Sequence, residues 1–192
     1  AFVIKTCLDL DHSADAYMFW CCSDLFEEQF MLPKPFVGSF GIVSNDGIPK
    51  PNFWAFKMLS QLHPQRLQLP MRTHEPVEYA AFTDGSNLQV IIYAQDNDCQ
   101  RNERFDVELS LNLAAQAVNV QRIDDTRCNP KAEWQKLGSP DDLTRQQVAE
   151  IKRSTCLKSE ALPFSIRDGH TELSVLLNTN DVILLSFDIK EA

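Results

Sequence analysis

Nine consecutive residues in the middle of the chain alternate strictly between apolar and polar side chains. In residues 105–113 every odd-numbered residue is apolar and every even-numbered residue is polar. A β-strand places successive side chains on opposite faces, so this pattern predicts a strand with one buried face and one face in water. The buried face needs a second layer to cover it. This requirement favours a fold made of packed β-sheets.

Similar patterns on both sides of this stretch predict further strands. They fall at residues 78–83, 88–95, 118–124, 173–178 and 182–189. Asp84-Gly85-Ser86-Asn87, between the first two of these strands, has the composition of a hairpin turn. Several short antiparallel strands at this spacing are typical of a β-sandwich. The fold class that we expect is therefore mainly β.

A short helical insertion interrupts the strands. Residues 130–138 predict a helix that Gly138 ends, because glycine is common just after a helix C-terminus. Thr144 and Gln147 have the spacing of a capping box, which predicts a second helix continuing to about Thr155.

The first third of the chain has a different pattern. It predicts the end of a helix up to about residue 10, a strand buried on both faces at 14–22, a long loop at 23–50 and a helix capped by Asn52. Periodicity is then lost among three prolines. We therefore expect three parts: a helix-strand-loop-helix unit at 1–62, a linker at 63–76 and a β-sandwich at 77–192.

Composition argues against several classes of partner. The formal net charge of the 192 residues is -9, and no cluster of Lys and Arg with aromatic residues occurs, so we expect no nucleic-acid binding by this segment. No apolar run of about 18 residues predicts a membrane span, and no export signal is visible, which favours a cytoplasmic location. The opening residues read as the end of a helix, so the chain could begin partway through a larger protein.

The cysteine pattern does not predict a metal site. The six cysteines are expected to be reduced thiols, because two of them are adjacent and the composition does not require disulfides. No Cys-x-x-Cys spacing occurs that would indicate zinc. We expect no metal and no cofactor.

Two groups of residues, spread over nearly the whole chain, carry a family resemblance. The first contains Phe19-Trp20 and residues 23–28, followed by 35–41 and 47–51. The second contains Val90-Ile91-Ile92-Tyr93-Ala94, Arg122-Ile123-Asp124-Asp125, Cys128-Asn129-Pro130, Glu133-Trp134 and Leu137-Gly138-Ser139-Pro140. In this order they resemble glycoside hydrolase family 39, the β-xylosidases and α-L-iduronidases. The first group is similar to the last strand, active-site loop and final helix of a (β/α)8 barrel, and the second to the family's accessory β-sandwich. The resemblance thus implies that residues 1–62 are the C-terminal remnant of a barrel.

The resemblance implies a retaining glycosidase of which this chain holds one part. Retaining enzymes use two carboxylates about 5 Å apart. In the family these glutamates follow the fourth and seventh barrel strands, so no catalytic residue is assigned in this chain. The implied partner is the missing N-terminal barrel portion of the same protein. A carbohydrate ligand and self-association are also possible partners.

The resemblance also implies residues that would bind substrate in an intact barrel: Trp20, Asp24, Glu27, Glu28 and Phe40. The two glutamates are similar to an acidic pair that lies beside the sugar, although two solvated loop acids would give the same pattern. Trp20 could stack on a sugar or pack in the core. Asp24 could bind backbone N–H groups and so orient the loop.

The chain departs from the family at one sugar-facing position. Residues 37–41 read Val-Gly-Ser-Phe-Gly where the family commonly has His-Gly-Gly-Phe-Gly, so an apolar Val37 replaces a polar group. This change puts xylosidase specificity in doubt. Two other functions remain open: a sugar-sensing C-terminal module of an AraC-type transcriptional regulator, and a free-standing structural or binding β-sandwich.

Overall fold

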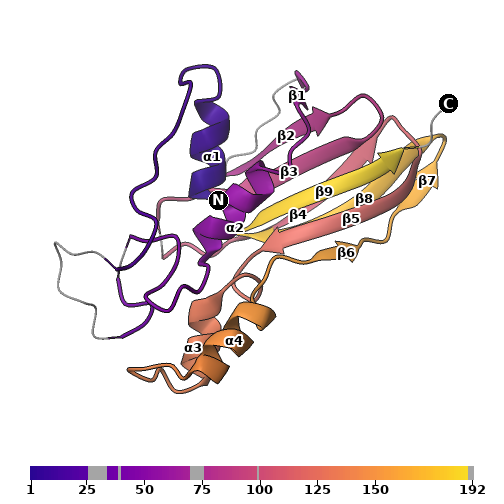
Figure 1. The fold of residues 1–192 in the computed structure, drawn as a ribbon. Helices are drawn as coiled ribbons and strands as arrows, with labels where there is room; N and C mark the ends of the chain where they lie inside the picture. Colours follow the sequence, from indigo (N-terminus) through magenta and orange to yellow (C-terminus); the bar gives the residue numbers. More distant parts are fainter. Residues whose placement is uncertain (26–33, 39, 70–75, 99, 190–192) are drawn as a thin grey trace.

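The computed structural model describes residues 1–25, 34–38, 40–69, 76–98 and 100–189. Within this part the chain forms four helices and nine strands (Figure 1). The helices are α1 (Phe2–Asp9), α2 (Pro51–Leu59), α3 (Pro130–Lys136) and α4 (Arg145–Ser154). The strands are β1 (Gln65–Arg66), β2 (Val77–Thr83), β3 (Leu88–Ala94), β4 (Arg104–Leu111), β5 (Ala115–Ile123), β6 (Ser159–Ala161), β7 (Ser165–Arg167), β8 (His170–Asn178) and β9 (Val182–Ile189).

The strands form two antiparallel sheets that pack face to face. The larger has the order β1-β2-β3-β9-β5-β6 and the smaller the order β4-β8-β7. Apolar side chains from both sheets make one core between them, among them Val90, Val118, Val175, Leu177 and Phe187. This arrangement confirms the predicted fold class, a mainly β sandwich with a helical insertion.

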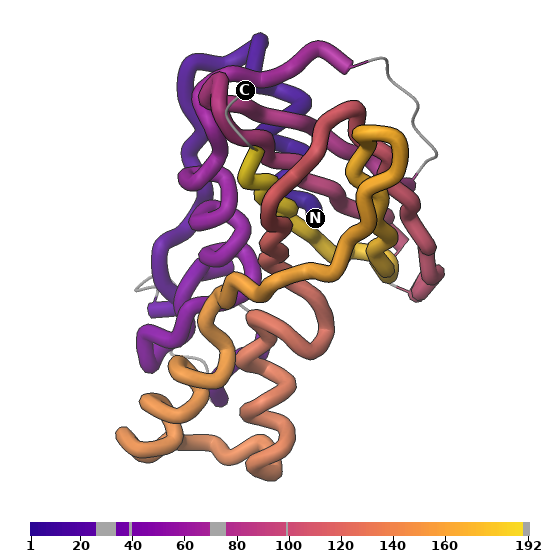
Figure 2. Tube along the Cα trace, turned by 90° about the vertical axis from the view of Figure 1, so that its right-hand side faces the viewer, coloured from indigo at the N-terminus to yellow at the C-terminus, as the bar shows by residue number. Residues whose placement is uncertain are grey.

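Helices α1 and α2 cover the outer face of the larger sheet. Ile4 of α1 and Met58 of α2 are fully buried against Ile91 and Leu184 of that sheet. Figure 2 shows the purple helix α2 on one side of the sheet and the orange β7–β8 pair on the other. The larger sheet is thus buried on both faces, which explains why every residue of β3 is buried, whereas exposure alternates along β4, which has one face in water.

Most of the predicted strands are present within one or two residues of the predicted bounds. The hairpin at 84–87 joins β2 to β3 with Thr83 opposite Leu88. The short strands β1, β6 and β7 were not predicted, because two or three residues are too few to show a period. Strand β1 falls within the stretch that we expect to be a linker, and the division into domains there stays a prediction.

The predicted strand at 14–22 is wrong. These residues form no strand, and Met18 is 99% exposed. A strand of a parallel sheet needs a neighbour along each edge, and the described part of the chain offers only an isolated bridge between Ser23 and Val43. The apolar pattern is therefore present, but the described residues include no strand that pairs with it along its length.

The helix predicted after the long loop begins earlier than expected. Pro51 occupies its first turn and Lys50 is the N-cap residue, so the prediction of Asn52 as the cap was wrong. Proline suits this position because its missing N–H would have no partner there. The capping box of α4 is confirmed: Thr144 Oγ1 accepts from the Gln147 N–H, and Gln147 Oε1 accepts from the Thr144 N–H.

The turn between β8 and β9 holds a buried carboxyl group. Asp181 Oδ2 accepts the Asn178 N–H at 2.7 Å, and burial, assisted by the negative charges of Asp124 and Asp125, raises the pKa of Asp181 from 3.8 to about 6. Its folded-state pKa thus lies above its unfolded value. The stability that this group contributes is full below about pH 4 and is lost as the pH rises through about 6.

We therefore expect Asp181→Asn to stabilise the chain at pH 8 and to have little effect at pH 4. The neutral amide oxygen still accepts the Asn178 N–H, and a shift of about two pKa units corresponds to up to about 3 kcal/mol. Thermal unfolding of both proteins at the two pH values measures the difference. An equal change at pH 4 and pH 8 would contradict this explanation.

Candidate functional site

A buried carboxylate lies at the centre of the predicted site. Asp24 Oδ1 accepts hydrogen bonds from the Gly41 N–H at 2.9 Å and from Lys50 Nζ at 2.6 Å. The Asp24 side chain is 1% exposed and that of Lys50 is 15% exposed, so both charges are largely removed from water. Asp24 Oδ2 is buried and has no hydrogen-bond partner within the described residues. The Gly41 contact agrees with the reading of Asp24 as a residue that orients the loop.

Backbone hydrogen bonds join the two sides of the long loop around this carboxylate. The Ile42 and Val43 N–H groups donate to the Cys21 and Cys22 carbonyls, both at 3.1 Å, and the Asp24 N–H donates to the Val43 carbonyl at 3.0 Å. The two segments approach so closely that a Cβ on residue 41 would lie 2.3 Å from the Asp24 backbone nitrogen. Only glycine fits there.

The far end of the loop is held by a tight turn. Ser44 is fully buried, and its Oγ accepts the N–H groups of Asp46 and Ile48 at 3.2 Å each. Gly47 has a φ of 68°, which favours glycine because it has no Cβ. The turn thus brings Ile48 into the interior of the molecule.

The helical insertion supports this loop. Phe36 and Ile48 pack with Trp134 of α3 and Ile151 of α4 in a small separate core, and the rings of Phe36 and Trp134 are 6.0 Å apart. Trp134 Nε1 donates to the Pro140 carbonyl at 2.9 Å, so its polar atom is satisfied. The insertion therefore helps to position the loop.

We call residues 21–24 and 41–43, together with Lys50, the anchor of the loop. The structure places two predicted aromatic residues on the surface beside this anchor. Trp20 is 68% exposed and Phe40 is 61% exposed. Each precedes a residue of the anchor: Trp20 joins Cys21 through a cis peptide bond, and Phe40 precedes Gly41. Trp20 is therefore not a core residue in this chain. Glu27 and Glu28 lie outside the described residues, and their role stays a prediction.

Sequence reasoning did not identify Lys50 as a partner of Asp24. The two residues are 26 positions apart, and a single lysine before a helix has no distinctive pattern.

Two further findings concern the described part of the chain alone. None of its helices is long and apolar enough to cross a membrane. It contains no cluster of three His, Cys, Asp or Glu side chains that could hold a metal ion.

The observed architecture agrees with the family resemblance: a β-sandwich carries helices on one outer face and follows a loop that Asp24 holds together. The model of glycosyl hydrolases family 39 matches residues 1–171, and the chain belongs to this family. The resemblance read from the sequence is thereby confirmed.

Curated relatives agree with this membership. The chain is 31% identical over 183 residues to a β-xylosidase of Caldicellulosiruptor saccharolyticus, and the alignment covers 92% of this chain and 38% of that protein. It is 25% identical over 192 residues to a β-xylosidase of Geobacillus stearothermophilus, covering 98% of this chain and 36% of that protein. The chain thus spans less than two fifths of the length of these relatives.

Solved structures show the same fold. A GH39 enzyme from Xanthomonas axonopodis pv. citri superposes with a TM-score of 0.76 at 20% identity, covering 98% of this chain and 40% of that one. A monomeric β-xylosidase from Caulobacter crescentus CB15 gives a TM-score of 0.75 at 23% identity, covering 99% of this chain and 41% of that one. At these identities the likeness concerns the fold alone.

Proposed function

We propose that this chain acts as the C-terminal part of a retaining β-glycosidase, with a xyloside as the first substrate to test. In this proposal residues 1–62 complete a (β/α)8 barrel and the β-sandwich supports it. The loop anchored by Asp24, together with Trp20 and Phe40, forms one wall of the sugar site. The nucleophile and the acid/base carboxylate belong to the remaining part of the protein, so the chain alone does not hydrolyse a glycoside.

The observation that carries the proposal is the apolar surface of the first segment. Met18, Trp20 and Phe40 are more than half exposed, and a groove of about 280 Å³ runs between α1, α2 and residues 16–19. Large exposed apolar side chains close together in a chain mark a surface that another part of a protein covers. The rest of the barrel is the natural occupant, because relatives in the family are more than twice as long as this chain.

The two aromatic residues support the sugar-site part of the proposal. The side chains of Trp20 and Phe40 are exposed. They lie close in sequence to residues that the buried ion pair of Asp24 and Lys50 holds in place. An aromatic ring offers a flat apolar face and loses little side-chain conformational entropy on binding. A rigid backbone keeps that face in place.

Hydrolysis of p-nitrophenyl β-D-xyloside tests the proposal. The chain alone should release no nitrophenol above the buffer rate, and activity should return when the preceding part of the full-length protein is co-expressed with it. Hydrolysis by the isolated chain would refute its inactivity. The alternative, a sugar-sensing module of a transcriptional regulator, predicts a different result. The upstream sequence would then encode a helix-turn-helix domain, and the reconstituted protein would bind xylose without hydrolysing the xyloside.

A further inference from the structure

Two cysteines flank the helical insertion. Cys128 lies two residues before α3, and Cys156 lies two residues after α4. Trp134 of α3 and Ile151 of α4 pack in the same small core, and the two helices lie side by side (Figure 1). Neighbouring helices with a short connection run antiparallel, so the start of the first lies near the end of the second. The insertion therefore brings Cys128 and Cys156 together at its base.

The sheet register supports this placement. Strands β5 and β6 lead into and out of the insertion, and their pairing places Gln121 opposite Ser159. Continuing this register toward the insertion places Cys156 opposite the first residue of the turn at 124–127. A backbone hydrogen bond of 3.2 Å closes that turn. The turn thus returns Cys128 to the end of β5, on the side from which Cys156 approaches.

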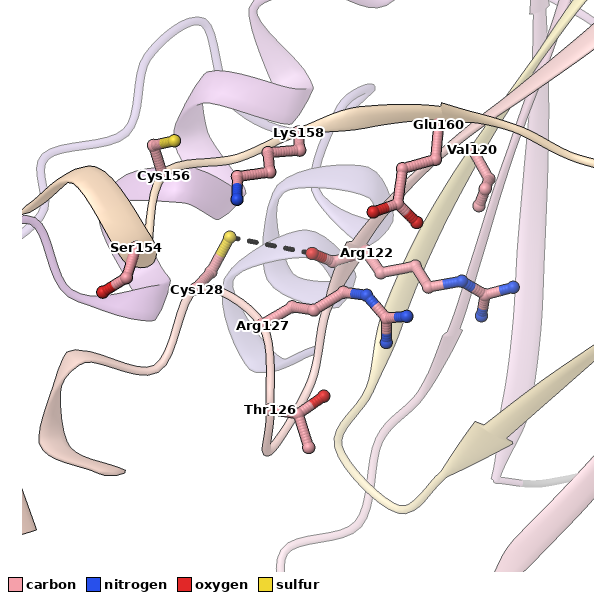
Figure 3. Close-up of a pocket in the computed structure, with 9 residues that line it drawn as sticks. All are labelled: Val120, Arg122, Thr126, Arg127, Cys128, Ser154, Cys156, Lys158 and Glu160. Atoms are coloured by element: carbon pink, nitrogen blue, oxygen red, sulfur yellow. Dashed lines mark hydrogen bonds between the residues drawn. The ribbon is translucent and has the colours of Figure 1, made fainter. Parts of the chain in front are cut away.

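Both thiols line one small pocket. Its volume is about 180 Å³, and Figure 3 shows the yellow sulfur atoms of Cys128 and Cys156 on the same side of it. The Cys128 thiol donates to the Arg122 carbonyl at 3.7 Å, and the Cys156 thiol donates to the Arg153 carbonyl at 3.3 Å. A thiol is a weak hydrogen-bond donor, so these bonds do not prevent either side chain from turning toward the other.

The two thiols differ in their access to solvent and in their acidity. Burial, followed by the charges of Asp124 and of Cys156, raises the pKa of Cys128 to about 12. An effect of one thiol on the other is electrostatic and requires that their sulfur atoms lie near each other. Cys128 is buried, whereas Cys156 is half-buried. Cys156 is therefore the thiol that an oxidant in solution reaches first.

We infer that Cys128 and Cys156 form a modification site, in which a small-molecule disulfide such as oxidised glutathione links them through an intramolecular disulfide. The Cys156 thiolate attacks one sulfur of the glutathione disulfide, which gives a mixed disulfide and releases one glutathione thiolate. Cys128 then gives up its proton, and its sulfur attacks Cys156 Sγ and displaces the second glutathione. The two protein thiols are oxidised, and one glutathione disulfide is reduced to two glutathione thiols.

A disulfide at this place constrains the support of the site loop. Trp134 and Ile151, which hold Phe36 and Ile48 of the loop, both lie between the two cysteines in the sequence. Linking the base of the insertion limits how far α3 and α4 can separate. The thiol pair belongs to this chain alone, so its chemistry does not depend on the proposed glycosidase function.

Peptide mapping after oxidation tests the pair. The folded chain is incubated with oxidised glutathione at about pH 8.5, where thiolates form more readily, and is then alkylated and digested with trypsin. Trypsin leaves Cys128 as the single cysteine of peptide 128–131 and Cys156 as that of peptide 154–158. The two peptides should be recovered joined by a disulfide. Absence of this species, or an equal yield from chain unfolded in urea, would overturn the inference.

Serine variants show whether the link is specific. Cys156→Ser should abolish the linked peptides, and the chain should still fold because Cys156 is only half-buried. Cys22→Ser removes an exposed thiol outside the insertion and should leave the link intact. Loss of the link in both variants would show that the pairing is unspecific and would refute the site.

Thermal unfolding measures the effect of the link on the insertion. Because a disulfide restricts the unfolded chain, the oxidised protein should unfold at a Tm about 5 °C or more above that of the reduced protein. The Cys156→Ser variant should show no such rise after the same treatment. An unchanged Tm in the linked protein would refute the constraint on the insertion.

Discussion

Replacing Gly41 by alanine is expected to detach the site loop from its anchor. The added Cβ would lie 2.3 Å from both the Ser23 carbonyl carbon and the Asp24 nitrogen, and 2.5 Å from Asp24 Oδ1. Backbone atoms cannot rotate away as a flexible side chain can. The two segments of the loop must therefore separate, and the four hydrogen bonds that join residues 21–24 to 41–43 are lost. At roughly 1 kcal/mol each, the loss is about 4 kcal/mol.

Gly38→Ala provides the matched control for this prediction. Gly38 has a φ of 66°, but a Cβ there would meet no atom within 4 Å, so the substitution introduces backbone strain without a clash. We expect it to cost about 1 kcal/mol. Urea unfolding gives both values, and hydrogen exchange should show loss of protection at Ile42 and Val43 in the Gly41 variant alone. Equal destabilisation by the two substitutions would mean that close approach at Gly41 is unimportant.

Local sequence patterns were sufficient for the sandwich. The alternation in β4, the turn residues of the β2–β3 hairpin and the capping box of α4 each act over fewer than ten residues. Their physical causes are the pleat of a strand, the freedom of glycine and the unpaired N–H groups at a helix start. These causes operate without reference to the rest of the chain, and for this reason they can be read from the sequence.

The site depends on contacts that no local pattern records. The apolar residues 14–22 have the composition of a buried strand, but a strand also requires neighbours, and residues distant in sequence must supply them. The pairing of Asp24 with Lys50 and the docking of Phe36 on Trp134 join residues 26 and 98 positions apart. Family resemblance predicts Asp24 and Phe40 as site residues, and this role stays a prediction, whereas only the structure reveals what holds Asp24 in position.

Asp24→Ala is the second substitution for which we expect a large effect. It removes the carboxylate that faces the Lys50 ammonium at 2.6 Å and that accepts the Gly41 N–H at 2.9 Å. Removing one partner of a buried ion pair leaves the other charge poorly compensated and typically costs 3–5 kcal/mol, so we expect about 4 kcal/mol in urea unfolding. Asp24→Asn should cost less, because its amide oxygen still accepts the Gly41 N–H although the charge is gone.

The ion pair between Lys34 and Asp141 is the control that isolates burial. Its atoms are 2.7 Å apart, nearly the same separation as in the buried pair, but its side chains are 46% and 68% exposed. Water already solvates both charges, so Asp141→Ala should change stability by less than about 1 kcal/mol. Distance alone would predict equal effects, whereas burial predicts a difference of about 3 kcal/mol. If the two alanine variants unfold at the same urea concentration, the Asp24 carboxylate does not anchor the loop.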